Sequence, residues 1–258
     1  MKKLLLLIVF SAGCIFAQSG IPGDDSKNSL MPPFYVNVLS AKSKAEGKSK
    51  FDIYFEVPFE GLQFLHADSV FTGLYRITCT ITDESKENIF YDQSWLETVK
   101  TNSFEETTNP MNSNYSQKSV DLAPGKYRVS CNMQDVDSKR YYLFDGVFTL
   151  RSYKDSVGVS DPFIIDRTIK DNGVDQLIPN TARIITTKDK EIPVFFEAYA
   201  DKPGSYSFEY CLRDAGGNIF YSKADTIIKL KAGTNEIYYT LKDFKCFLRR
   251  HSISHSFH

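Results

Sequence analysis

The cysteines are the first residues whose chemistry and spacing could matter. The sequence has 5 of them, and Cys79 and Cys131 each lie in a stretch where apolar and polar residues alternate. Because successive side chains of a strand point to opposite faces, both fall on the face that we expect to be buried. Two interpretations stay open. They form a disulfide if the strands lie close together in an oxidising compartment, or they are buried free thiols that pack as small apolar side chains, which we favour.

A second group of metal-type side chains lies near the C-terminal end. Cys246, His251, His255 and His258 have spacings that resemble half of a zinc site. A structural zinc ion needs about four ligands on a scaffold that fixes them. The segment 244–258 shows no strand or helix pattern and, unlike the rest of the chain, does not look like part of a native fold. We therefore predict no metal there.

The remaining candidates for catalysis are a histidine and several acids. His66 is the only histidine outside the tail, and we expect it in a loop near the end of a hairpin strand. The sequence contains no Gly-x-Ser-x-Gly elbow and no glycine-rich phosphate loop. The acid pair Glu105-Glu106 and the acids Asp135 and Asp137 are typical of solvated turns, and calcium needs about six or more oxygens. We predict no catalytic residue, no cofactor and no enzyme.

The elements that must position these residues are strands. Apolar residues alternate with polar ones over 51–57, 75–81 and 127–133, which is the pattern of strands with one buried face. No window sustains the spacing of an amphipathic helix, and turn residues separate the alternating stretches. The sequence therefore predicts an all-β protein built from antiparallel, Ig-like β-sandwiches.

An internal repeat divides the chain into two tandem sandwiches. Residues 75–91 match residues 206–221, including an Asn-Ile-Phe-Tyr run at Asn88 and again at Asn218. The junction falls near 153–158, which predicts one sandwich at 33–153 and a second at 159–243.

The second sandwich is expected to be incomplete. In the first copy a Pro124-Gly125 turn leads into a strand with Tyr127 at the place of a tyrosine corner. The second copy continues into the tail instead and would lack its last two strands, which would leave unpaired edges. A truncated or frame-shifted reading of a longer gene is the explanation that we favour.

The first residues read as an export signal. Lys2 and Lys3 precede the apolar run Leu4 to Phe10, and Ala17 offers a cleavage position, so we predict a signal peptide at 1–17. A competing reading places a lipid on Cys14, although Ser11 stands where a lipobox usually has Leu. Residues 18–32 are rich in Gly, Ser and Asp and are expected to be a disordered lead-in. No later stretch reaches the length of a transmembrane helix.

The charge excludes one class of partner. Lys and Arg number 31 against 32 Asp and Glu, which gives a formal net charge of -1. Such a chain has no overall field to attract nucleic acid.

Parts of the sequence resemble a known family. The stretches 51–58, 62–64, 75–83, 105–107 and 122–127 resemble the N-terminal half of GWxTD-domain proteins, which are exported bacterial proteins with β-sandwich segments before a C-terminal module. The resemblance spans about residues 30 to 243 and implies the fold and the export. The naming motif itself is absent, because the only tryptophan, Trp95, lies in a different context.

Two functions are compatible with these features of the sequence. The first is a non-enzymatic interaction or scaffold protein of the cell envelope, periplasmic, outer-membrane-associated or secreted. Its partner would be an unknown envelope protein or the missing C-terminal module of its own gene product. The alternative is an extracellular carbohydrate-binding module, for which Trp95 or the pair Tyr141-Tyr142 would supply stacking rings.

Overall fold

The computed structural model describes residues 6–10, 34–171, 174–181, 191–213 and 219–242. These residues form an all-β protein with several antiparallel sheets, as the alternating sequence pattern predicts. The expected lead-in at 18–32 and the tail at 244–258, with Cys14 and the tail histidines, lie outside the described residues. No helix in the described part of the chain is long and apolar enough to span a membrane.

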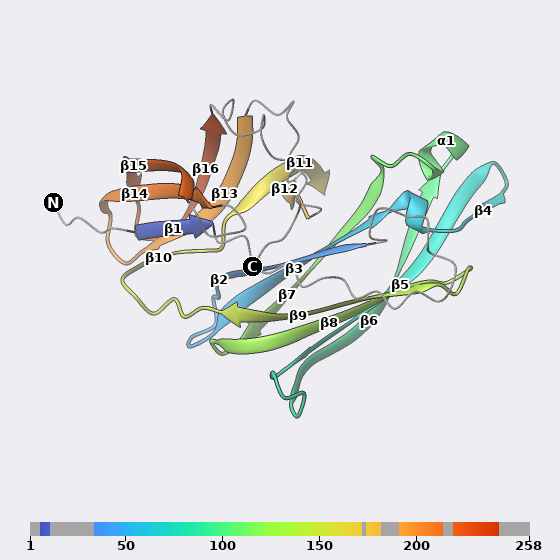
Figure 1. Ribbon diagram of the computed structural model, residues 1–258, viewed down its shortest axis with the longest axis horizontal. Helices are drawn as coiled ribbons and strands as arrows, with labels where there is room; N and C mark the ends of the chain where they lie inside the picture. The colour runs from blue at the N-terminus through green and yellow to red at the C-terminus, as the bar shows by residue number, and fades with distance from the viewer. Residues whose placement is uncertain (1–5, 11–33, 172–173, 182–190, 214–218, 243–258) are drawn as a thin grey trace. The chain divides into compact units, whose positions relative to one another are not determined.

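The chain divides into two compact units, residues 18–151 and residues 152–258 together with 1–17. In the first unit, a three-stranded and a five-stranded sheet form the two layers of a sandwich (Figure 1). The first sheet consists of β2 (Tyr35–Lys42), β3 (Ser49–Pro58) and β7 (Ser113–Leu122). The second consists of β4 (Phe64–Ala67), β5 (Val70–Thr82), β6 (Ile89–Thr101), β8 (Gly125–Asp135) and β9 (Tyr141–Leu150).

Alternation builds the core of this unit. Phe51, Ile53 and Phe55 on β3 are buried together with Tyr75 and Ile77 on β5. Burial of each such side chain contributes about 1.5–3 kcal/mol before the entropy of folding is counted.

One side-chain hydrogen bond and two short helical turns lie at the ends of the strands. The Tyr127 hydroxyl donates to the Ala123 carbonyl at 2.7 Å, the contact of a tyrosine corner. The 3-10 turn η1 (Phe59–Gly61) follows β3, and the single α-helical turn α1 (Phe104–Thr107) follows β6.

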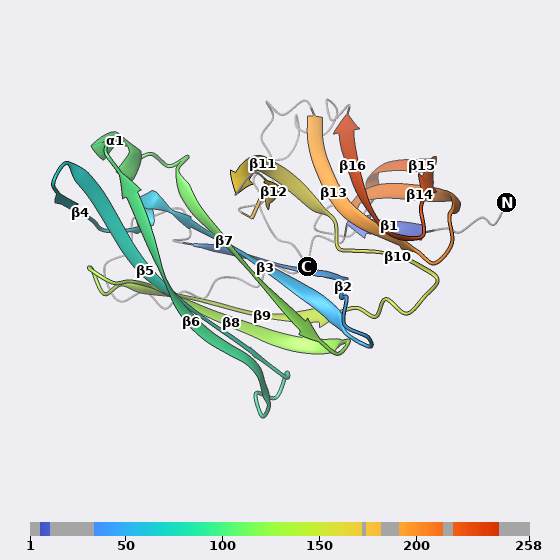
Figure 2. The same cartoon turned by 180° about the vertical axis from the view of Figure 1, so that it is seen from behind.

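The second unit also has two sheets, and Figure 2 shows them from the other side. One contains β10 (Val157–Val159), β11 (Phe163–Asp171), β12 (Val174–Pro179), β13 (Glu191–Ala200) and β16 (Gly233–Lys242). The other contains β1 (Leu6–Phe10), β14 (Gly204–Arg213) and β15 (Ile219–Leu230). Phe196, Ala198, Phe208 and Tyr210 are buried in its core.

The apolar part of the expected leader takes part in this second unit. Residues Leu6–Phe10 form the strand β1, which runs parallel to β14 with a continuous register from Leu6 opposite Phe208 to Phe10 opposite Leu212. The sequence patterns did not predict this pairing, because a continuous apolar run does not reveal its partner.

Candidate interaction surface

The two predicted cysteines meet in the core of the first unit. Cys79 on β5 and Cys131 on β8 are direct partners in register, and both are buried as free thiols. Their Sγ atoms lie 3.4 Å apart. Burial raises the pKa of the Cys131 thiol well above its ordinary value. The neutral thiol is a poor nucleophile, so this pair has a packing role in the reduced protein.

The predicted acids hold loops in place. Asp135 is fully buried, and its carboxylate accepts hydrogen bonds from the backbone N–H groups of Gln63 at 2.5 Å, Asp137 at 3.0 Å and Ser138 at 2.7 Å. Glu106 accepts a hydrogen bond from the Thr101 hydroxyl. The described residues contain no group of three or more His, Cys, Asp or Glu side chains that could hold a metal ion.

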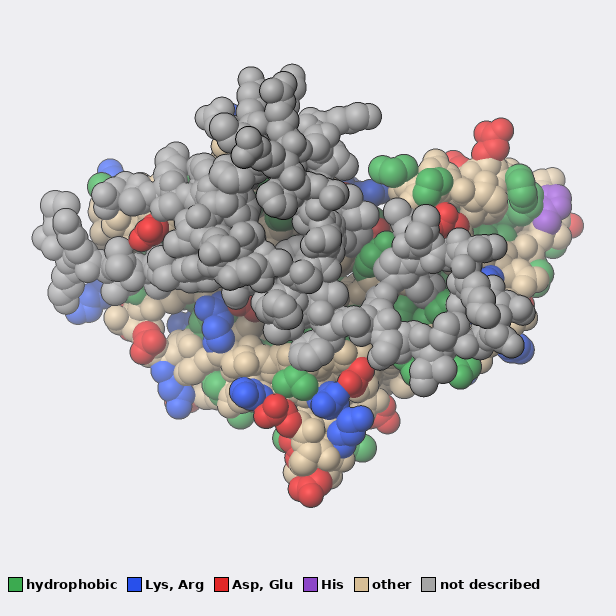
Figure 3. Space-filling model, viewed as in Figure 1, with side chains coloured by type: hydrophobic (Ala, Val, Ile, Leu, Met, Phe, Trp, Pro, Cys, Tyr) green, Lys and Arg blue, Asp and Glu red, His purple; other side chains and the backbone are tan. Residues whose placement is uncertain are grey.

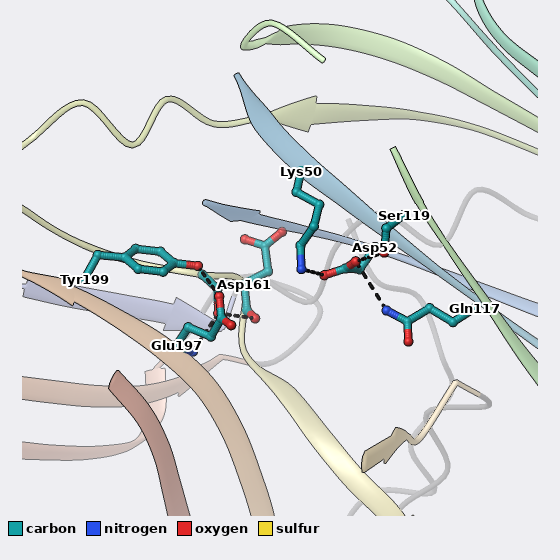
Figure 4. A network of polar contacts seen from close by, with 8 residues as sticks. Lys50, Asp52, Gln117, Ser119, Asp161, Glu197 and Tyr199 are labelled. Atoms are coloured by element: carbon teal, nitrogen blue, oxygen red, sulfur yellow. Dashed lines mark hydrogen bonds and ion pairs between the residues drawn. The ribbon is translucent and has the colours of Figure 1, made fainter. Parts of the chain in front are cut away.

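A polar network on β3 and β7 was not predicted from the sequence. Asp52 forms an ion pair with Lys50 at 2.9 Å and accepts hydrogen bonds from Gln117 at 3.3 Å and Ser119 at 2.5 Å (Figure 4). Its position between Phe51 and Ile53 already indicates a side chain that points away from the core of the unit. The carboxylate is satisfied by these partners.

A second network lies within the other unit. The Tyr199 hydroxyl donates to the Glu197 carboxylate, and the Ser160 hydroxyl oxygen accepts from the Glu197 backbone N–H at 2.9 Å. Figure 4 also shows Tyr199 and Glu197, which lie on β13. The contacts connect β13 to the segment that follows β10.

The aromatic residues considered as sugar platforms are covered or separated. Trp95 packs edge-on against the buried Phe55, with 5.3 Å between the ring centroids. The Nζ atom of Lys118 lies 4.7 Å from the Trp95 ring centroid. Tyr142 packs against the core, whereas its neighbour Tyr141 is 52% exposed. The pair therefore points to opposite faces, as expected for adjacent residues of a strand.

The outer face of the five-stranded sheet carries a polar ladder. Thr78 bonds to Ser94 at 3.0 Å and Thr80 bonds to Asp92 at 2.9 Å, across β5 and β6. Across β8 and β9, Asp145 accepts from Ser130 and is paired with Arg128. These side chains bond to one another, and the same face also carries the exposed side chains of Leu96, Tyr141 and Leu143.

Aromatic side chains also gather at one end of the first unit. We call this group the aromatic tip: His66 on β4, Phe71 on β5 and Phe104 on α1. The His66 ring stacks on Phe71 at 4.3 Å, and Phe71 lies 5.9 Å from Phe104 with the rings tilted by 54°. Phe104 is 64% exposed. In Figure 3, hydrophobic side chains and a histidine gather at this end, where Figure 1 places α1 and β4.

His66 and Phe71 of the tip lie on the same face of the sheet that is buried in the core further along β5. His66 is the register partner of Phe71, and Phe64 is the partner of Gly73. Phe71, Gly73 and Tyr75 share one face of β5 because they alternate, and Tyr75 is fully buried. The apolar face therefore runs on past the end of β3 at Pro58, where the opposite sheet stops.

A strained turn and a bonded helical turn hold the tip. β4 and β5 are joined by Asp68 and Ser69, whose φ angles are 48° and 66°. Positive φ at both positions is the conformation of a type I′ hairpin turn, which usually carries glycine or asparagine. In α1, the buried Thr107 hydroxyl donates to the Phe104 carbonyl at 2.6 Å. The Asn112 side chain, which follows α1 in the chain, donates to the Glu106 carbonyl at 3.0 Å.

The structure of the tip corrects the predicted placement of His66 and includes two residues that were not predicted. His66 lies in the strand β4 and not in a loop. Phe71 and Phe104 were not singled out from the sequence, although two apolar stretches on either side of Asp68-Ser69 are a hairpin signal that could have identified the tip.

Comparisons with known proteins add no relative to this description. No protein-family model matches the chain, and no curated protein is similar to it.

Proposed function

We propose that this chain is an exported, non-enzymatic protein of the bacterial cell envelope that binds another protein through the aromatic tip. The observation that carries the proposal is the exposure of Phe104, which a hydrogen-bonded helical turn holds beside Phe71 at the end of a sandwich. Exposed aromatic side chains on a rigid support lose little conformational entropy on binding and often form the centre of protein interfaces.

Export is supported by the first seventeen residues. The basic pair Lys2-Lys3, the apolar run to Phe10 and Ala17 make up a secretory signal, with Cys14 as the alternative site of lipid attachment. The resemblance to the N-terminal half of GWxTD-domain proteins agrees with export. The protein would then be periplasmic, outer-membrane-associated or secreted.

The shape of the tip favours a protein partner over a sugar. A sugar platform needs flat, coplanar rings with hydrogen-bonding groups beside them, whereas Phe71 and Phe104 are tilted by 54°. The polar ladder on the sheet and the covered face of Trp95 offer no such platform either. A carbohydrate-binding module is therefore the weaker of the two functions.

The proposal is tested by photo-crosslinking in the native cell. The photoreactive amino acid benzoylphenylalanine replaces Phe104 in one variant and Met111 in a control, because Met111 is 73% exposed but lies outside the tip. We expect a protein adduct at position 104 that is about tenfold stronger than at position 111, which corresponds to about 1.4 kcal/mol of preference. Equal adducts at both positions, or none, would overturn the proposal, and an adduct with a glycan would favour the alternative.

A further inference from the structure

The strand β14 has the same place in the second unit that β5 has in the first. Each pairs antiparallel with the next long strand of the chain, β15 or β6. Each carries Gly-x-Tyr near its start, at Gly73 and Tyr75 in β5 and at Gly204 and Tyr206 in β14. The pair β13 and β16 likewise corresponds to β3 and β7. Residues of β14 therefore match residues of β5 with a constant offset.

The second edge of β5 is covered by β8. Three inward positions of each strand meet in register, and all of them are buried: Ile77 with Met133, Cys79 with Cys131, and Ile81 with Val129. β8 supplies backbone hydrogen bonds and one apolar residue at every second position. A strand whose inward face is this apolar needs such a partner at its edge. Unpaired backbone N–H and C=O groups beside a core cost free energy, and an open edge promotes aggregation.

On β14 the matching positions are Phe208, Tyr210 and Leu212. Phe208 and Tyr210 are buried, at 1% and 3% exposure. All three positions are register partners of β1, opposite Leu6, Ile8 and Phe10. β1 thus occupies the place of β8 and has an apolar residue at each matching position, although it runs parallel. Within the described ranges, no other strand pairs with this edge of β14.

The occupant of this edge belongs to the expected leader. If residues 1–17 are removed during export, β14 loses β1 and its free edge becomes accessible. The rest of the sandwich stays in the chain, including β15 on the opposite edge. The edge then matches the known mode in which a sheet binds an extended segment as an added strand.

We propose that the β14 edge is an acceptor site for a β-strand from another polypeptide of the envelope, which the leader segment Leu6–Phe10 fills until it is cleaved. The inference rests on the export part of the proposed function. The incoming strand carries apolar residues at three alternate positions, as Val129, Cys131 and Met133 do in β8. The main chain supplies affinity, and the alternate side chains supply specificity.

The first experiment tests the leader in the full chain. Val9 is the register partner of Cys211. In a chain that carries Cys14→Ser and Cys246→Ser, Val9→Cys should crosslink to Cys211 with a short thiol-reactive linker. The matched control Ile8→Cys occupies the opposite phase of the strand and should crosslink weakly. Equal crosslinking by the two variants would overturn the placement of β1.

The second experiment tests the acceptor. The purified full chain is treated with signal peptidase, and binding of a fluorescent peptide with the sequence of residues 127–135 and Cys131→Val is measured before and after cleavage. We expect the affinity to rise about tenfold or more on cleavage. A peptide with serine at positions 129, 131 and 133 should not bind. Equal affinity before and after cleavage, or no binding after it, would overturn the acceptor, and a dimer of cleaved chains joined at β14 would assign the edge to a second copy instead.

The experiments distinguish a failure of the proposed function from a failure of the acceptor site. If the leader is never removed in the cell, the export part of the proposed function fails while the crosslink of Val9→Cys still forms. If the leader is removed and the peptide does not bind, export stands and the acceptor site fails.

Discussion

At the scale of single residues, several buried polar groups of the first unit are satisfied by specific partners. Asp135 is the clearest case, because three backbone N–H groups from two separate segments donate to one carboxylate. Asp135→Ala leaves these donors without an acceptor, and we expect it to lower the free energy of unfolding by about 3 kcal/mol. Urea denaturation measures the change, with Asp137→Ala as a control that should stay within about 0.5 kcal/mol. Equal losses in the two variants would contradict the role of Asp135.

The buried thiol pair makes a prediction about pH. Burial raises the pKa of Cys131, so the thiol stays neutral in the fold when it ionises in the unfolded chain. Its contribution to stability is complete below the unfolded thiol pKa of about 8.5 and is lost progressively above it. We expect the free energy of unfolding to fall more steeply between about pH 8.5 and 10 in the reduced protein than in Cys131→Ala. Parallel pH profiles from urea denaturation would contradict this.

Sequence patterns predicted part of this residue-scale account. The inward phase of Cys79 and Cys131 followed from alternation, and the structure places the two thiols side by side. The role of Asp135 did not follow, because its partner Gln63 is 72 positions away in the chain. Local patterns predict the face on which a residue lies but not the distant segment that meets it there.

At the scale of elements, the turn between β4 and β5 is strained. Ser69 has a φ of 66°, a conformation that glycine adopts at little cost. Ser69→Gly should therefore raise the free energy of unfolding by about 0.5–1 kcal/mol, whereas Ala67→Gly in the same hairpin should lower it by a similar amount. Thermal unfolding of both variants measures the difference. A destabilised Ser69→Gly would show that the serine side chain holds the turn.

The long strands were predictable and the short elements were not. The alternating stretches 51–57, 75–81 and 127–133 lie within β3, β5 and β8. The four-residue elements β4 and α1, which carry most of the aromatic tip, are too short for any periodicity to show. Their positions come from contacts with the longer strands, and such contacts leave no local pattern in the sequence.

At the scale of the whole molecule, the all-β class could be predicted because alternation recurs along the chain. The edge of β14 could be anticipated only in part. The repeat indicated an uncovered edge in the second sandwich, whereas its pairing with Leu6–Phe10 depends on a contact across about 200 residues. Both proposals depend on what happens to that N-terminal strand in the cell.

The most direct test of the account is the identity of the mature N-terminus, determined by mass spectrometry on protein isolated from the native envelope. If the leader is removed on export, the mature chain begins at Gln18, or at a lipid-bearing Cys14, and in either case lacks Leu6–Phe10. Protein recovered from the cytoplasm with residues 1–17 intact would contradict it, because the chain would then keep β1 and never expose the β14 edge.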